Sequence, residues 1–337
     1  MRPSRARNAV AALVAASAVV AGCTAAAPAV APPPDGALSR QVTTTATGAA
    51  AAPHLAALER IADAHGGNRA AGTPGYEATV DYVAGVLRTA GFDVATPVYD
   101  AGDGRELRNV VARTRGTDPA RVVLAGAHLD SVRAGPGIND DGTGIAGLLA
   151  AAAAIGPQPG TRNTVAFGFW GSEEDELQGS TGYVRDLSGD ERDALLLYLN
   201  ADMLGSPNGG YFVQGGHGDD SEERGPSGSG VVASVLADEL AAAGAPQPRT
   251  IGFYGDDESP FAEVGVPVAG AVTGDEDTKS GGEARLWGGT AGQAYDSCYH
   301  SACDRGGNVD AEKLDRYTRA IAATLARFAA AEQRPSG

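Results

Sequence analysis

Basic residues are scarce in this sequence. Its 337 positions hold 26 Lys and Arg residues against 42 Asp and Glu residues, and the formal net charge at pH 7 is −16. No run of basic residues reverses this balance locally. Such a surface repels nucleic acid, so we expect no nucleic-acid partner. Most of the acids are expected to form a solvated face that keeps the protein in solution.

The chain also lacks a long apolar stretch at its start. The apolar run 9–21 is shorter than the roughly 20 residues that a membrane-spanning helix needs. It follows Arg2, Arg5 and Arg7 and ends in small residues, a pattern that predicts an export signal over residues 1–22. Removing these three positive charges takes the net charge from −16 to −19.

The end of this signal contains one of only three cysteines in the chain. Residues 20–23, Val-Ala-Gly-Cys, resemble a bacterial lipobox, in which the cysteine carries lipid. We therefore expect lipidation of Cys23 and an extracytoplasmic protein anchored to the cell membrane. The alternative is an ordinary cleaved signal peptide with an incidental cysteine. In that case the protein would be released into the extracellular space.

Cys298 and Cys303 are then left as an even pair. In an oxidising compartment we expect them to form a disulfide that closes a small loop, with two free thiols as the alternative.

Large apolar side chains are almost absent from residues 23–52, which are rich in Ala, Pro and Thr. Such a composition buries too little surface to fold, so we predict a disordered tether there.

From residue 53 onward, helical and strand patterns alternate. Helical patterns cover 54–65, 76–90, 142–155, 177–188, 229–243 and 310–331, and strand patterns cover 92–99, 107–114, 121–126, 163–170, 195–200, 249–253 and 267–273. Strands separated by helices predict a single three-layer α/β/α domain over 53–333, with a mostly parallel central sheet and helices on both faces.

Candidate metal ligands follow the ends of the predicted strands. They are His128 and Asp130 after 121–126, Asp140 at the start of the next helix, Glu173 and Glu174 after 163–170, and Asp202 after 195–200, with His300 on a later loop. The carboxyl ends of parallel strands lie at one edge of a sheet. Imidazoles and carboxylates without thiolates suit zinc, manganese or cobalt. Five such ligands are too many for one tetrahedral zinc with an open position, so the pattern predicts a dinuclear site.

Several motifs together resemble one enzyme family. They are Gly-Ala-His-Leu-Asp-Ser at 126–131, Gly-Ile-Asn-Asp-Asp-Gly-Thr-Gly at 137–144, Trp-Gly-Ser-Glu-Glu at 170–174, Asn-Ala-Asp at 200–202 and Cys-Tyr-His at 298–300. Residues 68–76 and 288–293 add to the likeness, which covers 53–333. In order and spacing the motifs are similar to the co-catalytic two-zinc aminopeptidases of bacterial leucyl aminopeptidase and aminopeptidase S type, which have a zinc-exopeptidase, phosphorylase/hydrolase-like fold.

This resemblance implies a role for each candidate. His128 and Asp202 would hold one Zn²⁺, Glu174 and His300 the other, and Asp140 would bridge both. Glu173 would be the general base, Asp130 would accept the far ring N–H of His128, and Tyr299 would donate a hydrogen bond near the second metal. A cis peptide bond is implied after Asp140.

The substrates implied are the amino termini of peptides, with large apolar residues such as leucine preferred, and we expect a monomer. Some relatives bind Ca²⁺ near the C-terminal helix, where this chain has Asp310 and Asp315, with Arg319 at a place that would suit another acid.

Other functions remain open at this stage. The same scaffold serves carboxypeptidases, deacylases, glutaminyl cyclases and receptor-like domains without catalysis. A G-x-G-x-x-G match at 142–147 would suggest a dinucleotide-binding oxidoreductase, but it begins about fifteen residues after the strand end near Gly126, too far for a phosphate-binding turn. The chain departs from the family at 256–258, Asp-Asp-Glu, where Glu258 replaces a histidine and no basic residue precedes it. That departure casts doubt on binding of a short substrate's carboxylate and favours basic or longer peptides.

Overall fold

The computed structural model describes residues 36–102, 104–216 and 224–336. The predicted signal peptide 1–22 and Cys23 lie outside the described residues. Within the described part of the chain, no helix is both long and apolar enough to cross a membrane.

The described residues form a central sheet of eight strands. These are β1 (Asp93–Ala95), β4 (Val110–Arg113), β5 (Asp118–His128), β6 (Asn163–Trp170), β7 (Leu195–Ala201), β8 (Phe212–Gln214), β9 (Arg249–Ile251) and β10 (Val268–Val272). Their order is β1-β4-β6-β5-β7-β10-β8-β9. The central strands β6, β5, β7 and β10 run parallel, whereas β1–β4, β4–β6 and β10–β8 pair antiparallel. The predicted α/β class with a mostly parallel sheet is confirmed.

The central strands are apolar because both of their faces are covered. On β5, Val123 and Ala125 point into one apolar core, while Val122 and Leu124 point into the other. All eight residues of β6 are buried. Continuous apolar strands of this kind are typical of a parallel sheet between two helical layers.

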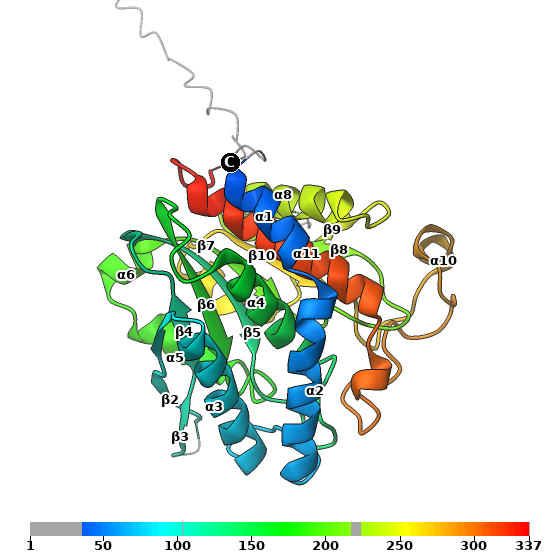
Figure 1. Cartoon of the computed structure of the whole chain (residues 1–337). Coiled ribbons are helices and arrows are strands. Elements are labelled where there is room, and N and C mark those ends of the chain that lie inside the picture. The colour runs from blue at the N-terminus through cyan, green and yellow to red at the C-terminus, as the bar shows by residue number, and fades with distance from the viewer. Residues whose placement is uncertain (1–35, 103, 217–223, 337) are drawn as a thin grey trace, which may run out of the picture.

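Helices cover both faces of this sheet. One core contains residues of α1 (Ala37–Thr45), α2 (Gly48–Ala64), α3 (Pro74–Thr89), α4 (Gly142–Ile155), α8 (Ser229–Ala242) and α11 (Ala311–Ala330); the other contains residues of α5 (Gln178–Asp186), α6 (Gly189–Ala194) and α9 (Ser259–Glu263). Figure 1 shows α2, α4 and α11 side by side on the near face of the sheet. The remaining elements are the hairpin β2 (Val98–Asp100) and β3 (Glu106–Arg108), α10 (Gly281–Trp287) and η1 (Gly306–Asn308).

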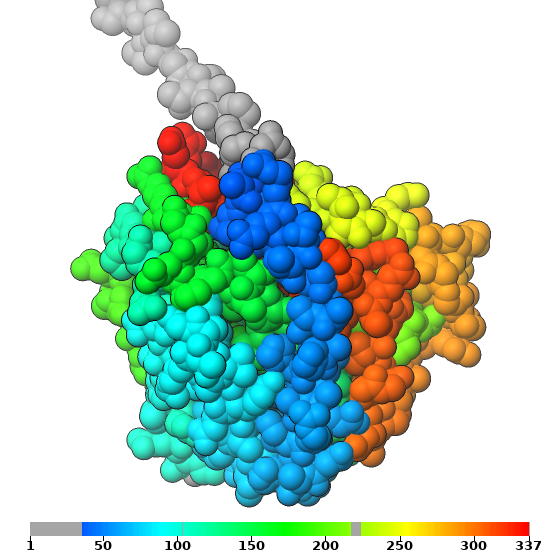
Figure 2. All heavy atoms as spheres, viewed as in Figure 1, coloured from blue at the N-terminus to red at the C-terminus, as the bar shows by residue number. Residues whose placement is uncertain are grey.

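The tether prediction is wrong for residues 36–52. Over these residues the chain forms α1 and the first turn of α2, and it packs on α4 and α11. Figure 2 shows this segment, in dark blue, as part of the compact surface. Val42, Ala46 and Ala51 are buried. Alanine has the highest helix propensity, and its small side chain lets helices approach closely, so the composition supports a packed helix here.

Two acids of the C-terminal region stabilise the helices around them. The Asp315 carboxylate accepts the Gly48 N–H at 2.8 Å and pairs with Arg319 at 2.7 Å. Asp310 caps α11 by accepting the N–H groups of Glu312 and Lys313. Both carboxylates, which the resemblance makes candidates for Ca²⁺, therefore already have partners within the protein, and we do not propose a calcium site.

Candidate metal centre

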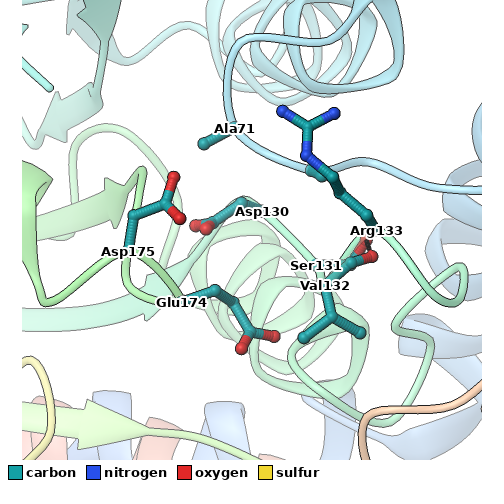
Figure 3. Close-up of a pocket in the computed structure, with 8 residues that line it drawn as sticks. Ala71, Asp130, Ser131, Val132, Arg133, Glu174 and Asp175 are labelled. Atoms are coloured by element: carbon teal, nitrogen blue, oxygen red, sulfur yellow. Dashed lines mark hydrogen bonds between the residues drawn. The ribbon is translucent and has the colours of Figure 1, made fainter. Parts of the chain in front are cut away.

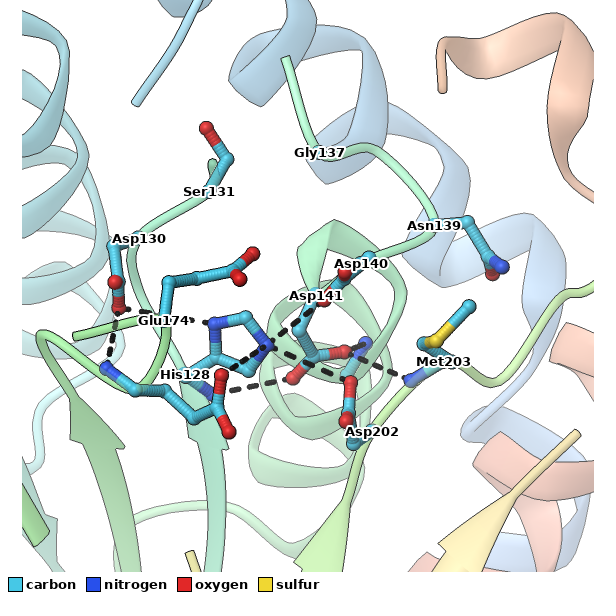
Figure 4. A network of polar contacts seen from close by, with 12 residues as sticks. His128, Asp130, Ser131, Gly137, Asn139, Asp140, Asp141, Glu174, Asp202 and Met203 are labelled. Atoms are coloured by element: carbon cyan, nitrogen blue, oxygen red, sulfur yellow. Dashed lines mark hydrogen bonds and ion pairs between the residues drawn. The ribbon is translucent and has the colours of Figure 1, made fainter. Parts of the chain in front are cut away.

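The predicted ligands converge at one edge of the sheet. His128 is the last residue of β5, Asp202 directly follows β7, and Glu173 and Glu174 lie just beyond the end of β6. Asp140 precedes α4, whose first turn points at this edge. Because β5, β6 and β7 are parallel neighbours, their carboxyl ends bring these side chains together (Figure 4).

Asp140 lies between the two predicted histidines. Its Oδ1 is 3.0 Å from His128 Nε2, and its Oδ2 is 3.2 Å from His300 Nε2. Asp202 Oδ1 lies 3.6 Å from His128 Nε2, and Glu174 Oε2 lies 2.9 Å from His300 Nε2. Each histidine thus has its own carboxylate partner, and the two oxygens of Asp140 face one pair each.

The donor atoms fit a pair of divalent cations. Asp202 Oδ1 and Glu174 Oε1 are buried and have no hydrogen-bond partner among the described residues. Buried carboxylate oxygens without a partner are costly, and imidazole nitrogens with carboxylate oxygens are suitable ligands for zinc-like ions. The donors gather into two groups, one containing His128 and Asp202 and the other Asp140, Glu174 and His300.

Asp141 also lies in the first group, but its carboxylate has other partners. Oδ2 accepts the His128 N–H at 3.1 Å, and Oδ1 accepts the N–H groups of Gly144 at 2.8 Å and Met203 at 3.3 Å. Asp141 therefore connects the end of β5, the first turn of α4 and the residues after β7 by hydrogen bonds beside the centre. The peptide bond between Asp140 and Asp141 is cis.

The carboxylates of the centre create a negative potential that favours positive charge on or near the two histidines. Burial alone would lower the pKa of His128, but the surrounding carboxylates of Asp130, Asp140 and Asp202 raise it well above its usual value. Contacts with Asp140 and Glu174 raise the pKa of His300 to about 10. The protein's own acids thus favour protonated imidazoles, and bound cations would satisfy the same field.

Glu173 extends from a loop that several side chains hold in place. Its backbone N–H donates to Asp130 Oδ1 at 3.2 Å, and its Oε2 lies 4.0 Å from His128 Nε2. The preceding Ser172 has a positive φ of 54° and shares a hydrogen bond of 2.9 Å with the Tyr99 hydroxyl. Burial raises the pKa of Glu173 well above its usual value; His128 opposes this effect, and neighbouring acids, with Asp257 first, add to it.

Asp130 lies beside His128 but not within hydrogen-bond distance. Its Oδ1 is 3.7 Å from His128 Nδ1, so the hydrogen bond implied by the resemblance is not formed at this separation. The same oxygen instead accepts the Glu173 N–H. The structure thus connects Asp130 most directly to the backbone of the predicted general base.

A short disulfide loop supplies the second histidine. Cys298 and Cys303 form a disulfide with Cα atoms 5.3 Å apart, and the loop between them carries Tyr299 and His300, whose rings stack with centroids 3.8 Å apart. Burial, followed by the charges of nearby acids including Asp140, raises the pKa of Tyr299 above its usual value.

Three buried residues that the sequence analysis did not assign to the centre also support it. Besides Asp141, Asp304 accepts the N–H groups of Asn139 at 2.8 Å and Asp140 at 3.1 Å. Arg69 is fully buried and donates to the carbonyls of Leu129, Pro136 and Gly137. The available signals were the position of Asp304 next to Cys303 and that of Arg69 within the motif at 68–76.

A pocket opens beside Asp130 and Glu174. Its lining residues are Ala70, Ala71, Asp130, Ser131, Val132, Arg133, Glu174 and Asp175. Figure 3 shows them converging from the loop before α3 and from the loops after β5 and β6. The second candidate metal group therefore borders an open part of the surface.

Comparisons with known proteins agree with this architecture. Residues 109–325 match Peptidase family M28. Leupeptin-inactivating enzyme 1 of Streptomyces exfoliatus is 41% identical over 288 residues, covering 84% of this chain and 62% of that protein. The probable lipoprotein aminopeptidase LpqL of Mycobacterium tuberculosis is 40% identical over 237 residues, covering 68% and 47%.

Solved structures share the fold. The Legionella pneumophila LapA aminopeptidase superposes with a TM-score of 0.68 at 17% identity, covering 88% of this chain and 74% of that one. Tannerella forsythia glutaminyl cyclase superposes with a TM-score of 0.60 at 19% identity, covering 86% and 100%.

This chain spans between two fifths and about three fifths of the length of the first curated relatives it matches. The family match nevertheless includes β5, β6, β7, α4 and all five candidate ligands. The chain belongs to Peptidase family M28.

Proposed function

We propose that this chain is a zinc-dependent aminopeptidase that removes one residue at a time from the amino termini of peptides. The observation that carries the proposal is the position of Asp140, whose two oxygens face His128 and His300 at 3.0 and 3.2 Å. His128 and Asp202 would hold one Zn²⁺, Glu174 and His300 the other, and Asp140 both. When bound, such a pair of cations supplies Lewis acidity, which makes a water molecule acidic and polarises the peptide carbonyl.

Glu173 is the proposed general base. Its carboxylate lies 4.0 Å from His128 Nε2, next to the candidate ligands without belonging to either metal group. It takes the proton of the attacking water and returns it to the amine that leaves. Asp130 and Ser172 hold its backbone in place.

Tyr299 is proposed to stabilise the oxyanion. Its ring stacks on His300, and the charges of Asp140, Asp202 and Glu174 act on its hydroxyl. Because burial, and then those charges, disfavour the phenolate, the hydroxyl keeps its proton and can donate a hydrogen bond.

The proposed setting is outside the cytoplasm. The sequence predicts an export signal and lipidation of Cys23, and a relative named as a probable lipoprotein aminopeptidase supports this. We propose a membrane-anchored monomer with a preference for large apolar amino-terminal residues such as leucine.

The test combines metal analysis with three substrates. We expect two zinc ions per purified chain and hydrolysis of leucine anilide, with no hydrolysis of the N-acetylated analogue. Cleavage of the blocked substrate would favour a deacylase or an endopeptidase, and cyclisation of a glutaminyl peptide would favour a glutaminyl cyclase. Absence of bound metal after reconstitution would contradict the proposal.

A further inference from the structure

The proposed ligand His300 lies on a loop outside the sheet, whereas three of the other ligands stand at or just after strand ends. This loop, residues 296–304, consists of turns and is called the ligand loop below. His300 has a positive φ of 51°. Such a conformation is uncommon for a residue other than glycine, and it persists where surrounding contacts determine it. The position of this ligand therefore depends on what holds the loop.

Asp296 connects the start of the ligand loop to the segment of the bridging aspartate. Its Oδ1 accepts the Cys298 N–H at 2.8 Å, and its Oδ2 accepts the side-chain N–H of Asn139 at 2.7 Å. Asn139 directly precedes Asp140. Asn308 donates to both oxygens of Asp296, each at 2.9 Å. Asp296 is buried, and both of its oxygens face donors.

The end of the ligand loop is attached to the same segment. The Asp304 carboxylate accepts the N–H groups of Asn139 and Asp140, and its carbonyl accepts the Ile138 N–H at 3.2 Å. The disulfide closes the loop between these two attachment points. The contacts at both ends therefore fix the position of His300 relative to Asp140.

The backbone of the ligand loop also packs directly against Gly135. A Cβ atom at this position would lie 2.1 Å from the Ser301 carbonyl oxygen and 2.7 Å from its carbon, so only glycine allows this approach. Ser301 directly follows His300. Arg69 holds the same stretch from the other side by donating to the carbonyls of the two residues after Gly135. The ligand loop thus rests on a part of the chain that is itself held in place.

We infer that Asp296 is a positioning residue for the metal ion proposed at Glu174 and His300, and that it sets the affinity of this site from behind the ligands. The inference rests on the proposed two-zinc aminopeptidase. His128 and Asp202 stand at the ends of β5 and β7, so the sheet fixes them independently of the ligand loop. A loosened loop would let His300 leave its carboxylate partners, and only the ion at this site would then bind more weakly.

The variant Asp296→Asn tests this role. An NH₂ group replaces one of two oxygens that both face donors, so at least one hydrogen bond is lost, whereas Asp140 keeps the bond from its N–H to Asp304. Equilibrium dialysis of the purified chain against buffers of fixed free Zn²⁺ concentration counts the ions bound. We expect the weaker binding step to need about 10- to 100-fold more free zinc than in the wild type, the usual effect of losing a contact behind a metal ligand. The other step should be unchanged, and excess zinc should restore hydrolysis of leucine anilide.

A second variant displaces the same loop without touching an acid. The methyl group of Gly135→Ala would push against the backbone of Ser301, so the same selective weakening is expected. Its matched control is Gly85→Ala in α3, where an added Cβ would meet no described atom within 4 Å outside its own helix. Asp315→Asn, which also removes an acceptor of a backbone N–H, is the control for Asp296→Asn. Both controls should leave both binding steps unchanged.

A ligand variant assigns the effect to one of the two sites. His300→Ala should lose the weaker step by itself, and adding Asp296→Asn to it should not change the remaining step. Two ions bound as tightly as in the wild type, or an equal weakening of both steps, would overturn the inference and leave the aminopeptidase function intact. A wild-type chain that binds no zinc would overturn both. If Asp296→Asn does not fold, Gly135→Ala decides the matter.

Discussion

Asp140 and Asp141 are adjacent in the chain, but their carboxylates have different kinds of partner. The oxygens of Asp140 face two histidines, whereas those of Asp141 accept three backbone N–H groups. A carboxylate that accepts several backbone N–H groups acts like a cap, fixing the chain around it. Asp141 therefore orients its neighbour, which is free to act as a ligand.

Replacing Asp141 tests this structural role. In Asp141→Asn one acceptor oxygen becomes an NH₂ group that faces backbone donors, so at least one buried N–H loses its partner. We expect the free energy of unfolding of the metal-free protein to fall by about 2 kcal/mol, measured by urea denaturation. Asp175→Asn, an exposed acid near the centre, should change it by less than about 0.5 kcal/mol; equal effects would contradict the role.

Glu173 should matter for turnover and not for metal binding. Glu173→Gln removes the carboxylate that accepts the proton of water, and loss of such a group costs about 10²–10⁴ in rate. We expect kcat for leucine anilide to fall by about 10³, with the zinc content unchanged. Near-normal hydrolysis would show that another group is the base.

At the scale of elements, sequence patterns located the strands that carry the centre. The pattern at 163–170 coincides with β6, and those at 121–126 and 195–200 fall within β5 and β7. The central stretches of these strands are buried and mostly apolar because they lie between two helical layers. The short strand β8 and the helices α6, α9 and α10 were missed, because elements of three to seven residues show too little periodicity.

The N-terminal helices show a different limit of sequence reasoning. Composition alone suggested that residues 36–52 could not bury enough surface, yet Val42 and Ala46 are buried. The partner surface, on α4 and α11, lies more than 90 residues away in sequence, so composition within the segment could not reveal it.

The contact that holds these helices should depend on pH. Burial would raise the pKa of Asp315, but the hydrogen bonds from Arg319 and from the Gly48 N–H lower it below its usual value. An acid whose pKa falls on folding adds stability above its unfolded pKa, and this stability disappears as the pH drops through the folded pKa.

We therefore expect Asp315→Asn to lower the free energy of unfolding by about 1 kcal/mol at pH 7, with the difference shrinking below about pH 4. Thermal unfolding at several pH values measures this. Glu312→Gln, which breaks the pair with Arg316 on the same helix, is the control and should cost less than about 0.5 kcal/mol. A difference for Asp315→Asn that is independent of pH would contradict the argument.

At the scale of the whole molecule, the ligands were predictable and their supports were not. His128, Asp140, Glu174, Asp202 and His300 stand in motifs next to strand ends, where topology brings them together. Asp304 and Arg69 act through backbone groups of distant loops. Both residues stand near recognisable motifs, Arg69 within 68–76 and Asp304 next to Cys303. The backbone groups that they contact follow only from the folded arrangement, so the sequence marked their positions without revealing their partners.

The molecule has two poles, and the helix α4 joins them. Its first residue follows Asp141 at the candidate metal centre, and its last turn contains Ala154, whose carbonyl accepts a hydrogen bond from the Gln41 side chain of α1. A helix of 14 residues is about 21 Å long. The helix α1, with which the described chain begins, therefore lies at the end of α4 away from the centre; Figure 1 shows α1 beside α11. The proposed anchor, attached before α1, would then leave the centre open to peptides.

The proposed lipid anchor can be removed without touching that centre. Cys23→Ser eliminates the thiol that would carry the lipid, so the protein should move from the membrane fraction to the soluble extracytoplasmic fraction, measured by fractionation and immunoblotting. Because the centre lies at the opposite pole, kcat/KM for leucine anilide should stay within about twofold of the wild-type value, since changes distant from a site are usually independent of it. Thr24→Ala, which changes the next residue and keeps the thiol, should remain with the membrane. Membrane retention of Cys23→Ser would contradict the anchor, and a large loss of activity in the released protein would contradict the separation of the two poles.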